Sequence, residues 1–464
     1  MKSWFGSRRM LGIASPALGA LALSGLALAG LSLPTGCALP ESSIGESYTT
    51  IQLTNTLSMV RDNEPIEIPL SEVRARFKKF DESDFSVHVL PANWYPERGD
   101  ALLATDPAPT IPAQVIDKNF DGTPDTLLVI CDFRAGEKRF LAVASPQFSR
   151  LSKATGPRVG GGLMVRETTR REGGALKSEG RYVAVNNAVL DQQHVKGDGL
   201  YQCDGPVFET DSNGWRLLFD SRMCLDVIGK RERELYLQPK NAAFTADAID
   251  LSNQPWGGSL LGDIAGFGAG AFGYAEKGSV VPMSGFDSAQ FRLMKGGPAA
   301  LEAEVVLFGA KLGKESFDLR WRITQYAGSR MLRHDVNVSR TGHGLAFVMN
   351  ADGLKKELPS GGQSWMRVSS YGPSNVGGGA TGSLGLGVLA NGRTATGFVK
   401  DPADVIGVAF DTITRNLTFY SVAAWDGEPM GLRSAQDFQK YLDELAQRLD
   451  TPIKIANLDK AIGN

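Results

Sequence analysis

The densest group of chemically active side chains lies between residues 203 and 230, among residue types that favour strands. Arg216, Asp220, Arg222 and Asp226 all stand at even-numbered positions. Because side chains alternate between the two faces of a strand, this spacing predicts that they share one face. Guanidinium groups bind a uronate carboxylate through paired hydrogen bonds, and carboxylates accept sugar hydroxyls or transfer protons. The segment therefore predicts either a sugar site or a solvated face with cross-strand ion pairs.

An aromatic residue among glycines follows this segment. Trp256 precedes Gly257 and Gly258, and Asp263 comes shortly after them. A flat ring with open space beside it can stack on a sugar, and an acid nearby can bind its hydroxyls. Packing of the ring into the core is the alternative interpretation.

A short acidic segment resembles the first half of a calcium-binding loop. Asp117, Asn119 and Asp121 stand at its first, third and fifth positions, a glycine at the sixth and Asp125 at the ninth. The bidentate glutamate of the twelfth position is absent, because Leu128 stands there. The segment predicts either a structural calcium or a turn stabilised by its own Asp and Asn side chains. We expect no other cofactor.

Two cysteines flank a hairpin signal. Asn213-Gly214 is the dipeptide that most favours a two-residue hairpin turn. If these residues form the turn, Cys203 and Cys224 lie directly opposite each other on the paired strands, within disulfide reach. The alternative is two small buried side chains.

The N-terminus reads as an export signal over residues 1–36, with a basic start and an apolar stretch over residues 11–33. The sequence Leu-Pro-Thr-Gly-Cys that ends at Cys37 resembles a bacterial lipobox, whose cysteine is lipidated. A plain signal peptide cut nearby is the alternative. We expect an exported protein of the cell envelope, lipid-anchored to the outer membrane or facing the periplasm.

The charge balance excludes some classes of partner. The chain has 464 residues, with 49 basic and 51 acidic side chains and a formal net charge of −2. Nucleic-acid binding favours a basic excess, so we expect no nucleic-acid partner. Only four histidines are present, which argues against a multi-histidine metal centre.

The elements that must position these residues are mostly strands. The 54 glycines favour turns and bulges, and short apolar strands recur without alternating helices, which excludes a doubly wound sheet. We predict a mainly β protein. Its parts are a small β domain over residues 44–150, a linker or exposed loop over 151–180, and a large antiparallel β-sandwich over 181–455. A C-terminal helix closes the sandwich, with Ser434 as its N-cap and an apolar stripe at Phe438, Tyr441, Leu442, Leu445 and Leu449.

Several short motifs, taken in order, resemble the domain-of-unknown-function family 4861 of exported bacterial proteins. They are Ile111–Asp125, Gly205–Glu209, Trp215–Phe219, Leu225–Lys230, Trp256–Gly270, and Trp425 with the final helix. The resemblance spans about residues 85–455. It implies a companion of polysaccharide-degradation loci, and some members carry annotations borrowed from unsaturated glucuronyl hydrolases. By fold-level analogy it implies a mutarotase-like sugar-binding sandwich.

These observations together predict a carbohydrate-active enzyme that acts on uronate-containing polysaccharide, with a lyase mechanism first. Arg216 or Arg222 would neutralise the uronate carboxylate, His194 would be the base and Tyr201 the acid.

Two alternatives stay open. A glycoside hydrolase would use Glu209 with Asp226 or Asp263 as its carboxylate pair. A non-catalytic glycan-binding lipoprotein would use aromatic platforms together with the same arginines. Those platforms are Trp256, Trp365, Tyr371 and Trp425.

Overall fold

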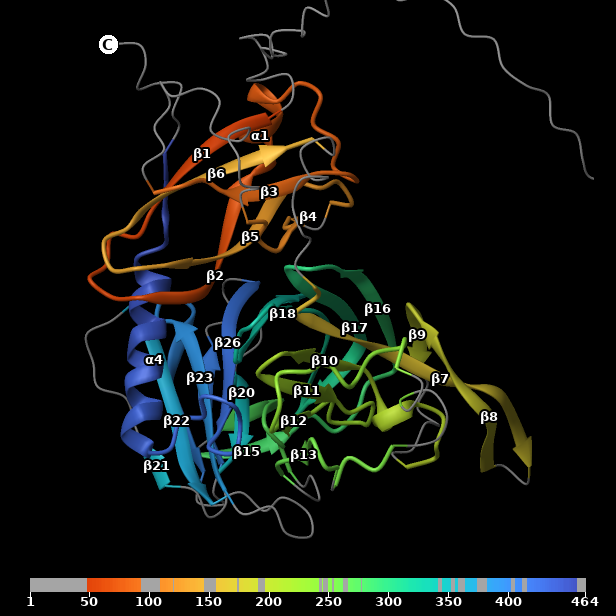
Figure 1. Cartoon of the computed structure of the whole chain (residues 1–464). Helices are drawn as coiled ribbons and strands as arrows, with labels where there is room; N and C mark the ends of the chain where they lie inside the picture. The colour runs from red at the N-terminus through yellow and green to blue at the C-terminus, as the bar shows by residue number, and fades with distance from the viewer. Residues whose placement is uncertain are drawn as a thin grey trace, which may run out of the picture. The chain divides into compact units, whose positions relative to one another are not determined.

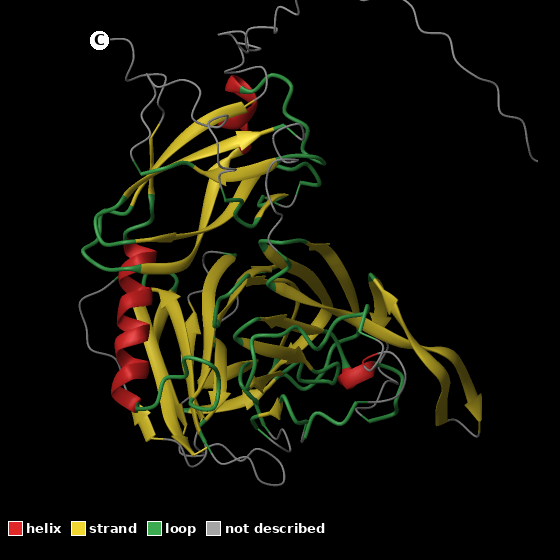
Figure 2. Cartoon of the chain, in the orientation of Figure 1, coloured by secondary structure: helices red, strands yellow, loops and turns green. Residues whose placement is uncertain are grey.

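Strands dominate the computed structural model, and one long helix lies near the C-terminus (Figures 1 and 2). This is the mainly β fold that the sequence predicts. The structure describes residues 48–456 apart from several internal stretches. The residues left out are 93–108, 120, 146–155, 173–174, 191–196, 242–243, 245–248, 253, 262–265, 277, 341–343, 352–354, 358–363, 374–381, 402–404 and 411–414.

Two small sheets form the N-terminal part of the described chain. One has the strand order β27-β1-β6-β3 and the other β2-β5-β4. Leu53, Val73, Phe77 and Leu127 belong to the core that these sheets share with one short helix. The elements are β1 (Tyr48–Thr54), β2 (Arg61–Pro69), α1 (Leu70–Arg76), β3 (Ser86–Val89), β4 (Ala113–Ile116), β5 (Thr126–Phe133), β6 (Lys138–Ala144) and β27 (Lys454–Ala456). Because β27 pairs with β1, the last described strand completes the sheet that the first one starts.

A six-stranded sheet, in the order β13-β12-β11-β10-β7-β8, contains the motif-rich segment. Its strands are β7 (Val159–Glu172), β8 (Ala175–Val185), β10 (Val207–Thr210), β11 (Asn213–Leu217), β12 (Leu225–Lys230) and β13 (Gly257–Ser259), and the short helix η2 (Gln202–Asp204) precedes β10. β7 and β8 occupy most of the region expected as a linker, so that expectation is wrong. The outer half of this hairpin is solvated on both faces, and its strands therefore lack the apolar alternation that marks a half-buried strand.

The largest sheet, which we call the large sheet, has nine described strands in the order β21-β22-β23-β26-β19-β18-β17-β16-β9. They are β9 (Asn187–Leu190), β16 (Ser288–Gly296), β17 (Ala300–Leu312), β18 (Glu315–Tyr326), β19 (Met331–Val338), β21 (Lys355–Glu357), β22 (Trp365–Pro373), β23 (Ser383–Asn391) and β26 (Asn416–Trp425). A five-stranded sheet, in the order β15-β14-β20-β25-β24, packs against it. Its strands are β14 (Ala271–Glu276), β15 (Ser279–Pro282), β20 (Leu345–Asn350), β24 (Ala395–Asp401) and β25 (Val405–Phe410).

The core of the sandwich is aromatic. The ring of Phe272 lies 5.1 Å from that of Trp321, centroid to centroid, and Phe347 lies 4.7 Å from Phe419. All four side chains are buried. Such edge-to-face and tilted pairs add to the burial of apolar area, which is the main stabilising contribution. One face of the large sheet therefore packs into the core, and its other face can carry polar side chains.

The C-terminal helix α4 (Ala435–Asp450) begins and packs as the sequence predicts. The Ser434 hydroxyl accepts the backbone N–H of Asp437 at 3.0 Å and so caps the helix. Phe438 and Leu442 pack on β22 and β23, where Gly385 leaves room for the Phe438 ring. Within the described ranges, no helix combines the length and apolar character needed to cross a bilayer.

The contact between α4 and the large sheet generates the first prediction. Phe438 is fully buried, so Phe438→Ala leaves a cavity and should lower the free energy of unfolding by about 3–5 kcal/mol. Lys440 lies on the same helix with its side chain 76% exposed, and Lys440→Ala is the matched control. Urea unfolding followed by circular dichroism measures both variants. Equal midpoints for the two would show that α4 does not depend on this packing.

Candidate functional site

Three neighbouring strands of the large sheet carry polar residues at alternate positions. Cross-strand pairing aligns them in rows, with Arg333 between Thr324 and Tyr420 in one of these rows. The next two rows are Arg322, Asp335 and Thr418, and Arg320, Asn337 and Asn416. We call this surface of β18, β19 and β26 the polar face. The residues between these positions, such as Trp321 and Phe419, point into the core.

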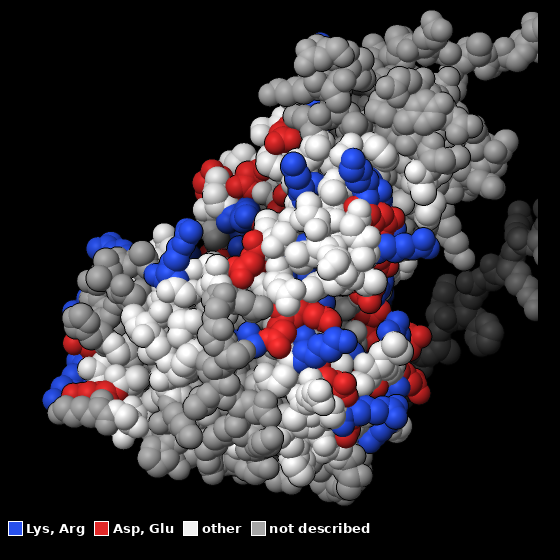
Figure 3. Space-filling model, turned by 90° about the vertical axis from the view of Figure 1, so that its left-hand side faces the viewer, with Lys and Arg blue, Asp and Glu red and all other residues white. Residues whose placement is uncertain are grey.

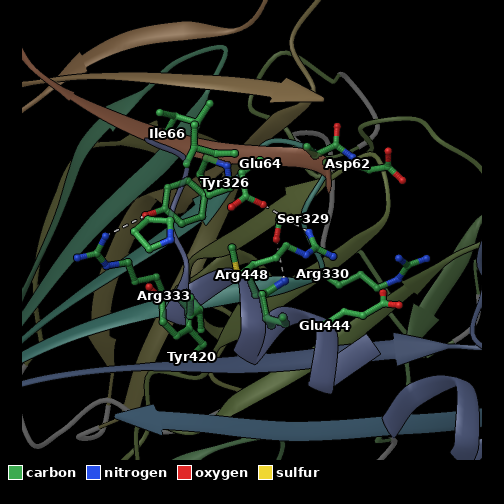
Figure 4. A pocket seen from close by; sticks show the side chains of 18 of the residues that line it. Asp62, Glu64, Ile66, Tyr326, Ser329, Arg330, Arg333, Tyr420, Glu444 and Arg448 are labelled. Carbon is green, nitrogen blue, oxygen red and sulfur yellow. Dashed lines mark hydrogen bonds and ion pairs between the residues drawn. The ribbon is translucent and has the colours of Figure 1, made fainter. Parts of the chain in front are cut away.

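A cavity of about 820 Å³ lies where β2, the turn from β18 to β19 and helix α4 meet the polar face. We call it the arginine–tyrosine cavity. Figure 4 shows Tyr326, Arg333 and Tyr420 together on one side of it, with Glu64 and Arg448 nearer its centre. The cavity therefore collects residues from both ends of the described chain.

Arg333 is the best-connected side chain of this cavity. Its Nη1 donates to Glu67 Oε1 at 2.6 Å and to the Tyr326 hydroxyl at 3.2 Å. Its Nε lies 2.8 Å from Asp335 Oδ2. Burial by itself would raise the pKa of Glu67, but Arg333 and Lys118 outweigh it and hold that pKa below its ordinary value. The Glu67 carboxylate is thus kept ionised.

The two tyrosines beside Arg333 are held in their neutral form. Burial raises the pKa of Tyr420 to about 12, against the opposing charge of Arg333, and it raises that of Tyr326 well above 10. The Tyr420 hydroxyl has no hydrogen-bond partner among the described residues. The Trp365 ring lies 5.4 Å from the Tyr420 ring, centroid to centroid. Tyr420 can therefore donate a proton or a hydrogen bond to a ligand beside an aromatic wall.

Arg448 projects from α4 into the same cavity. Its Nη1 lies 3.6 Å from Glu64 Oε2, whereas Arg61 donates to Glu64 Oε1 at the shorter distance of 2.9 Å. The Nε of Arg448 is buried and has no hydrogen-bond partner within the part of the chain that the structure describes. A buried guanidinium N–H without a partner is costly unless a ligand satisfies it. Arg448 is therefore suited to bind an anion.

Arg330 and Glu444 occupy the other side of this cavity in Figure 4. Arg330 Nε donates to Glu428 at 2.6 Å, and its guanidinium lies over the Tyr441 ring. On the face of the molecule shown in Figure 3, acidic and basic side chains lie next to one another. This agrees with the balanced composition of the chain.

Glu209, expected as a catalytic carboxylate, lies inside the protein. Its Oε2 is 3.1 Å from Lys230 Nζ and accepts the backbone N–H of Tyr236, and its Oε1 accepts that of Leu237 at 2.6 Å. The side chains of Glu209 and Lys230 are both 0% exposed. Burial raises the pKa of Glu209 and lowers that of Lys230, and their mutual attraction opposes both shifts. This pair has no room for a substrate.

Arg216 and Tyr201 do share a cavity, of about 320 Å³. Arg216 Nη2 donates to Asp226 Oδ2 at 2.8 Å, and the Ser259 hydroxyl donates to Asp226 Oδ1 at 3.0 Å. Arg216 stands on β11 and Asp226 directly opposite it on β12, so the two side chains lie on one face of the sheet although they belong to different strands. Arg222 lies in the turn between these strands, where its Nη2 donates to Asp220.

The four aromatic residues predicted as stacking platforms lie in different surroundings. Trp256 stacks on Tyr236, with ring centroids 4.6 Å apart, so one of its faces is occupied. Trp425 is buried and lies under Arg231. Tyr371 is buried and donates its hydroxyl to the Leu432 carbonyl. Of the four, Trp365 lines the arginine–tyrosine cavity.

Three expected residues lie outside the described residues. They are His194, Asp263 and Cys37. The roles predicted for them as base, acid or sugar-binding group, and lipidation site therefore stay predictions.

The hairpin that was expected to join the cysteines has a different register. Phe208 pairs with Trp215, so Asn213 and Gly214 belong to strand β11 rather than to the turn. Asp211 and Ser212 form the turn instead, and the Thr210 hydroxyl stabilises it by accepting the backbone N–H groups of Ser212 and Asn213. The disulfide expectation is therefore wrong: Cys203 and Cys224 are both buried, and no disulfide joins them. This is the alternative that the sequence had left open.

The Asp117 segment forms a turn whose side chains accept its own backbone N–H groups. Asp117 accepts from Gly122, Asp121 from Thr123, and Asp125 from Lys118 and Asn119. Among the described residues, no group of three or more His, Cys, Asp or Glu side chains is arranged to hold a metal. The turn therefore has a structural explanation without a metal, and calcium binding stays a prediction.

Of the residues that line the arginine–tyrosine cavity, Trp365 is a predicted site residue, whereas Arg333, Tyr420 and Arg448 are not. The missed signal was alternation of polar and apolar residues in 320–324, 333–337 and 416–420. The three segments predict one polar sheet face, provided that they are neighbours. Their adjacency is a property of the strand order, which the sequence does not state.

Comparison with known families agrees with the motifs. Residues 53–455 match the family described as domain of unknown function, DUF4861. The chain belongs to this family. No protein with a curated description matches this DUF4861 chain significantly.

Two solved structures from Enterococcus faecalis resemble this DUF4861 protein weakly. One is a protein in glycosyl hydrolase family 38, with a TM-score of 0.41, 9% identity, and coverage of 88% of this chain and 47% of the other. The second is an alpha-mannosidase with the same score and identity and coverage of 88% and 46%. The chain thus spans about half the length of these structures.

The buried Glu209–Lys230 pair generates the second prediction. Glu209→Gln leaves Lys230 without its counter-charge, so it should cost about 3–5 kcal/mol of stability. Glu167→Gln removes a solvated partner of Arg181 and should leave the unfolding midpoint unchanged. Urea unfolding compares the two variants. A stable Glu209→Gln variant that loses only catalytic turnover would instead return Glu209 to the catalytic candidates.

Proposed function

We propose that this DUF4861 protein is a carbohydrate-active enzyme that acts on uronate-containing polysaccharide in the arginine–tyrosine cavity, by β-elimination. The observation that carries the proposal is Arg448, whose guanidinium makes no hydrogen bond to the described residues, in a cavity that also holds protonated tyrosines. A uronate carboxylate would satisfy Arg448 and neutralise its charge. Uronate lyases need such a cation, a base and an acid.

Residues near Arg448 supply the base and the acid. With the uronate carboxylate held by Arg448, the proton next to it becomes more acidic, and the Glu64 carboxylate is placed to remove it. The carbon–oxygen bond to the next sugar then breaks and a carbon–carbon double bond forms. Tyr420, neutral at physiological pH, donates its proton to the leaving oxygen. Trp365 offers a flat surface on which a sugar ring can stack.

The hydrolase alternative has less support from this cavity. A hydrolytic general acid is a carboxyl group with a raised pKa. The pKa of Glu67 is instead held below its ordinary value by Arg333 and Lys118, and Glu64 lies between Arg61 and Arg448. The binding-protein alternative is supported by Trp365, which would serve as a platform without any chemistry.

The third prediction concerns turnover. Purified protein is incubated with pectic, ulvan-type, alginate and glucuronan polysaccharides, and ultraviolet absorbance and reducing ends are followed together. We expect both to rise on one of them, since elimination creates a conjugated double bond. Reducing ends without absorbance would indicate a hydrolase. Retention on an affinity gel of the glycan without either signal would indicate a binding protein.

Substitutions in the cavities test where the reaction takes place. Tyr420→Phe and Arg448→Gln should each lower kcat/KM about 100-fold or more. Tyr274→Phe on β14 and Arg393→Gln in an exposed turn are matched controls that should retain activity. Tyr201→Phe tests the smaller cavity next to Arg216. Loss of activity in Tyr201→Phe alone would move the site there and refute the arginine–tyrosine cavity.

We also propose, from the lipobox-like sequence, that the protein is exported and anchored to the membrane through Cys37. The fourth prediction is that mass spectrometry of the protein from a bacterial host finds a lipidated N-terminal Cys37. Cys37→Ala should lose the lipid and leave the membrane fraction, whereas Cys203→Ala should keep both. An unmodified N-terminus at another residue would indicate a plain signal peptide.

A further inference from the structure

Strand β2 contains a bulge where it borders the arginine–tyrosine cavity. The pairing of β2 with β5 shifts between Arg61 and Glu64. Asp62 and Asn63 therefore stand opposite a single residue of β5, Asp132. Asn63 has a positive φ of 50°, a conformation that asparagine adopts more readily than most residues. Bulges of this kind change the direction of neighbouring side chains and are over-represented beside active sites.

The bulge determines where Glu64 points. Residues three positions apart in a regular strand lie on opposite faces of it. Because of the extra residue, Arg61 and Glu64 lie on the same side of β2, and Arg61 Nη1 donates to Glu64 Oε1 at 2.9 Å. Glu64 Oε2 is left to face Arg448, whose Nη1 lies 3.6 Å away in the cavity (Figure 4). The orientation of the base proposed above therefore depends on the bulge.

The side chain of Asn63 is held by residues from outside β2. Its Oδ1 accepts a hydrogen bond from Arg158 Nη1 at 2.6 Å. Arg158 donates through Nε and Nη2 to Asp211 Oδ2, at 3.0 and 2.8 Å. Asp211 lies in the turn between β10 and β11, and its backbone N–H donates to the Arg158 carbonyl at 3.2 Å. All three nitrogens of the planar guanidinium are thus engaged, which fixes its orientation.

The turn between β18 and β19 packs against the same group. Gly328 in this turn has a φ of 71°, and a Cβ atom there would lie 2.5 Å from Arg158 Nη2 and 2.6 Å from Asn63 Cγ. Asn63 and Gly328 both line the arginine–tyrosine cavity. The missing side chain at Gly328 therefore lets the turn approach the Asn63 amide and limit the movement of the bulge.

We propose that Asn63 is a positioning residue, which through Arg158 and Asp211 holds the β2 bulge in the conformation that directs the Glu64 carboxylate toward the substrate. The inference rests on the proposed function, in which Glu64 removes the proton. It implies that loss of the bond between Asn63 and Arg158 slows the chemical step. Binding of the uronate, which depends on Arg448, should change little.

Two substitutions of Asn63 separate the side-chain bond from the backbone conformation. Asn63→Gly retains a residue that adopts positive φ but removes the acceptor for Arg158. On a polysaccharide that the wild-type protein cleaves, we expect kcat to fall about 10–100-fold with little change in KM, because a misplaced catalytic group has effects of this size. Asn63→Asp keeps an acceptor oxygen and should retain most of the wild-type kcat.

A double-mutant cycle shows whether Asn63 acts through Glu64. Glu64→Gln removes the base and lowers kcat by itself. If Asn63 only positions Glu64, adding Asn63→Gly to Glu64→Gln should lower kcat no further. Circular dichroism confirms that each variant is folded.

The other partner of the bond supplies a second comparison. Arg158→Gln should reproduce the loss of kcat seen in Asn63→Gly, because it removes the donor of the same hydrogen bond. Arg340→Gln removes the exposed ion pair with Glu315 and is the control, which should keep the wild-type kcat.

The outcomes separate the two proposals. If Asn63→Gly keeps the wild-type kcat, or lowers kcat equally with and without Glu64→Gln, the positioning role is refuted while the proposed function stands. The same holds if Asn63→Asp is as slow as Asn63→Gly. If no uronate polymer is cleaved, or if Glu64→Gln cleaves it at the wild-type rate, the proposed function fails and the positioning role fails with it.

Discussion

A guanidinium group that is removed from water must be surrounded by hydrogen-bond acceptors. Because the acceptors around Arg333 come from β2 as well as from the large sheet, this residue determines how the two meet. It stands on a central strand of the large sheet and binds Glu67 of β2, Asp335 of its own strand and the hydroxyl of Tyr326. Removing any of these partners would leave a buried charge with fewer acceptors. The same contacts bring β2 to the polar face and hold the tyrosines beside a cation.

Burial decides which ionisable residues of this protein can act on a substrate. Glu209 and Lys230 have the residue types of a catalytic pair, yet they satisfy each other in a dry interior that no substrate reaches. Arg448 and Glu64 are also a pair of opposite charges, but they face a cavity. The distance between them, 3.6 Å, is longer than that between Glu209 and Lys230, and it leaves hydrogen-bonding capacity of Arg448 unused. The difference lies in solvent access and not in chemistry. A charged residue on a strand is therefore a candidate site residue only when a substrate can reach it.

Structure followed from the sequence where the signal was local. Helix α4 follows from Ser434 and the apolar stripe, because capping and amphipathic spacing act within a few residues. The register of the 207–217 hairpin did not follow from Asn213-Gly214. The Thr210 hydroxyl accepts a backbone N–H group of the turn, and the Asn213 side chain donates to the Ala423 carbonyl of the large sheet. A tertiary contact overrode a local turn preference at that point.

The sequence alone determined that this chain is mainly β, that a capped helix closes it and that it belongs to the DUF4861 family. These properties depend on composition, periodicity and motif order, all of which can be seen along the chain. The tertiary structure alone decided that β19 lies between β18 and β26, so that Arg333, Asp335 and Asn337 join residues from distant segments in one polar face. The physical reason is that strand order minimises exposed apolar area over the whole sandwich, and no local pattern records that choice.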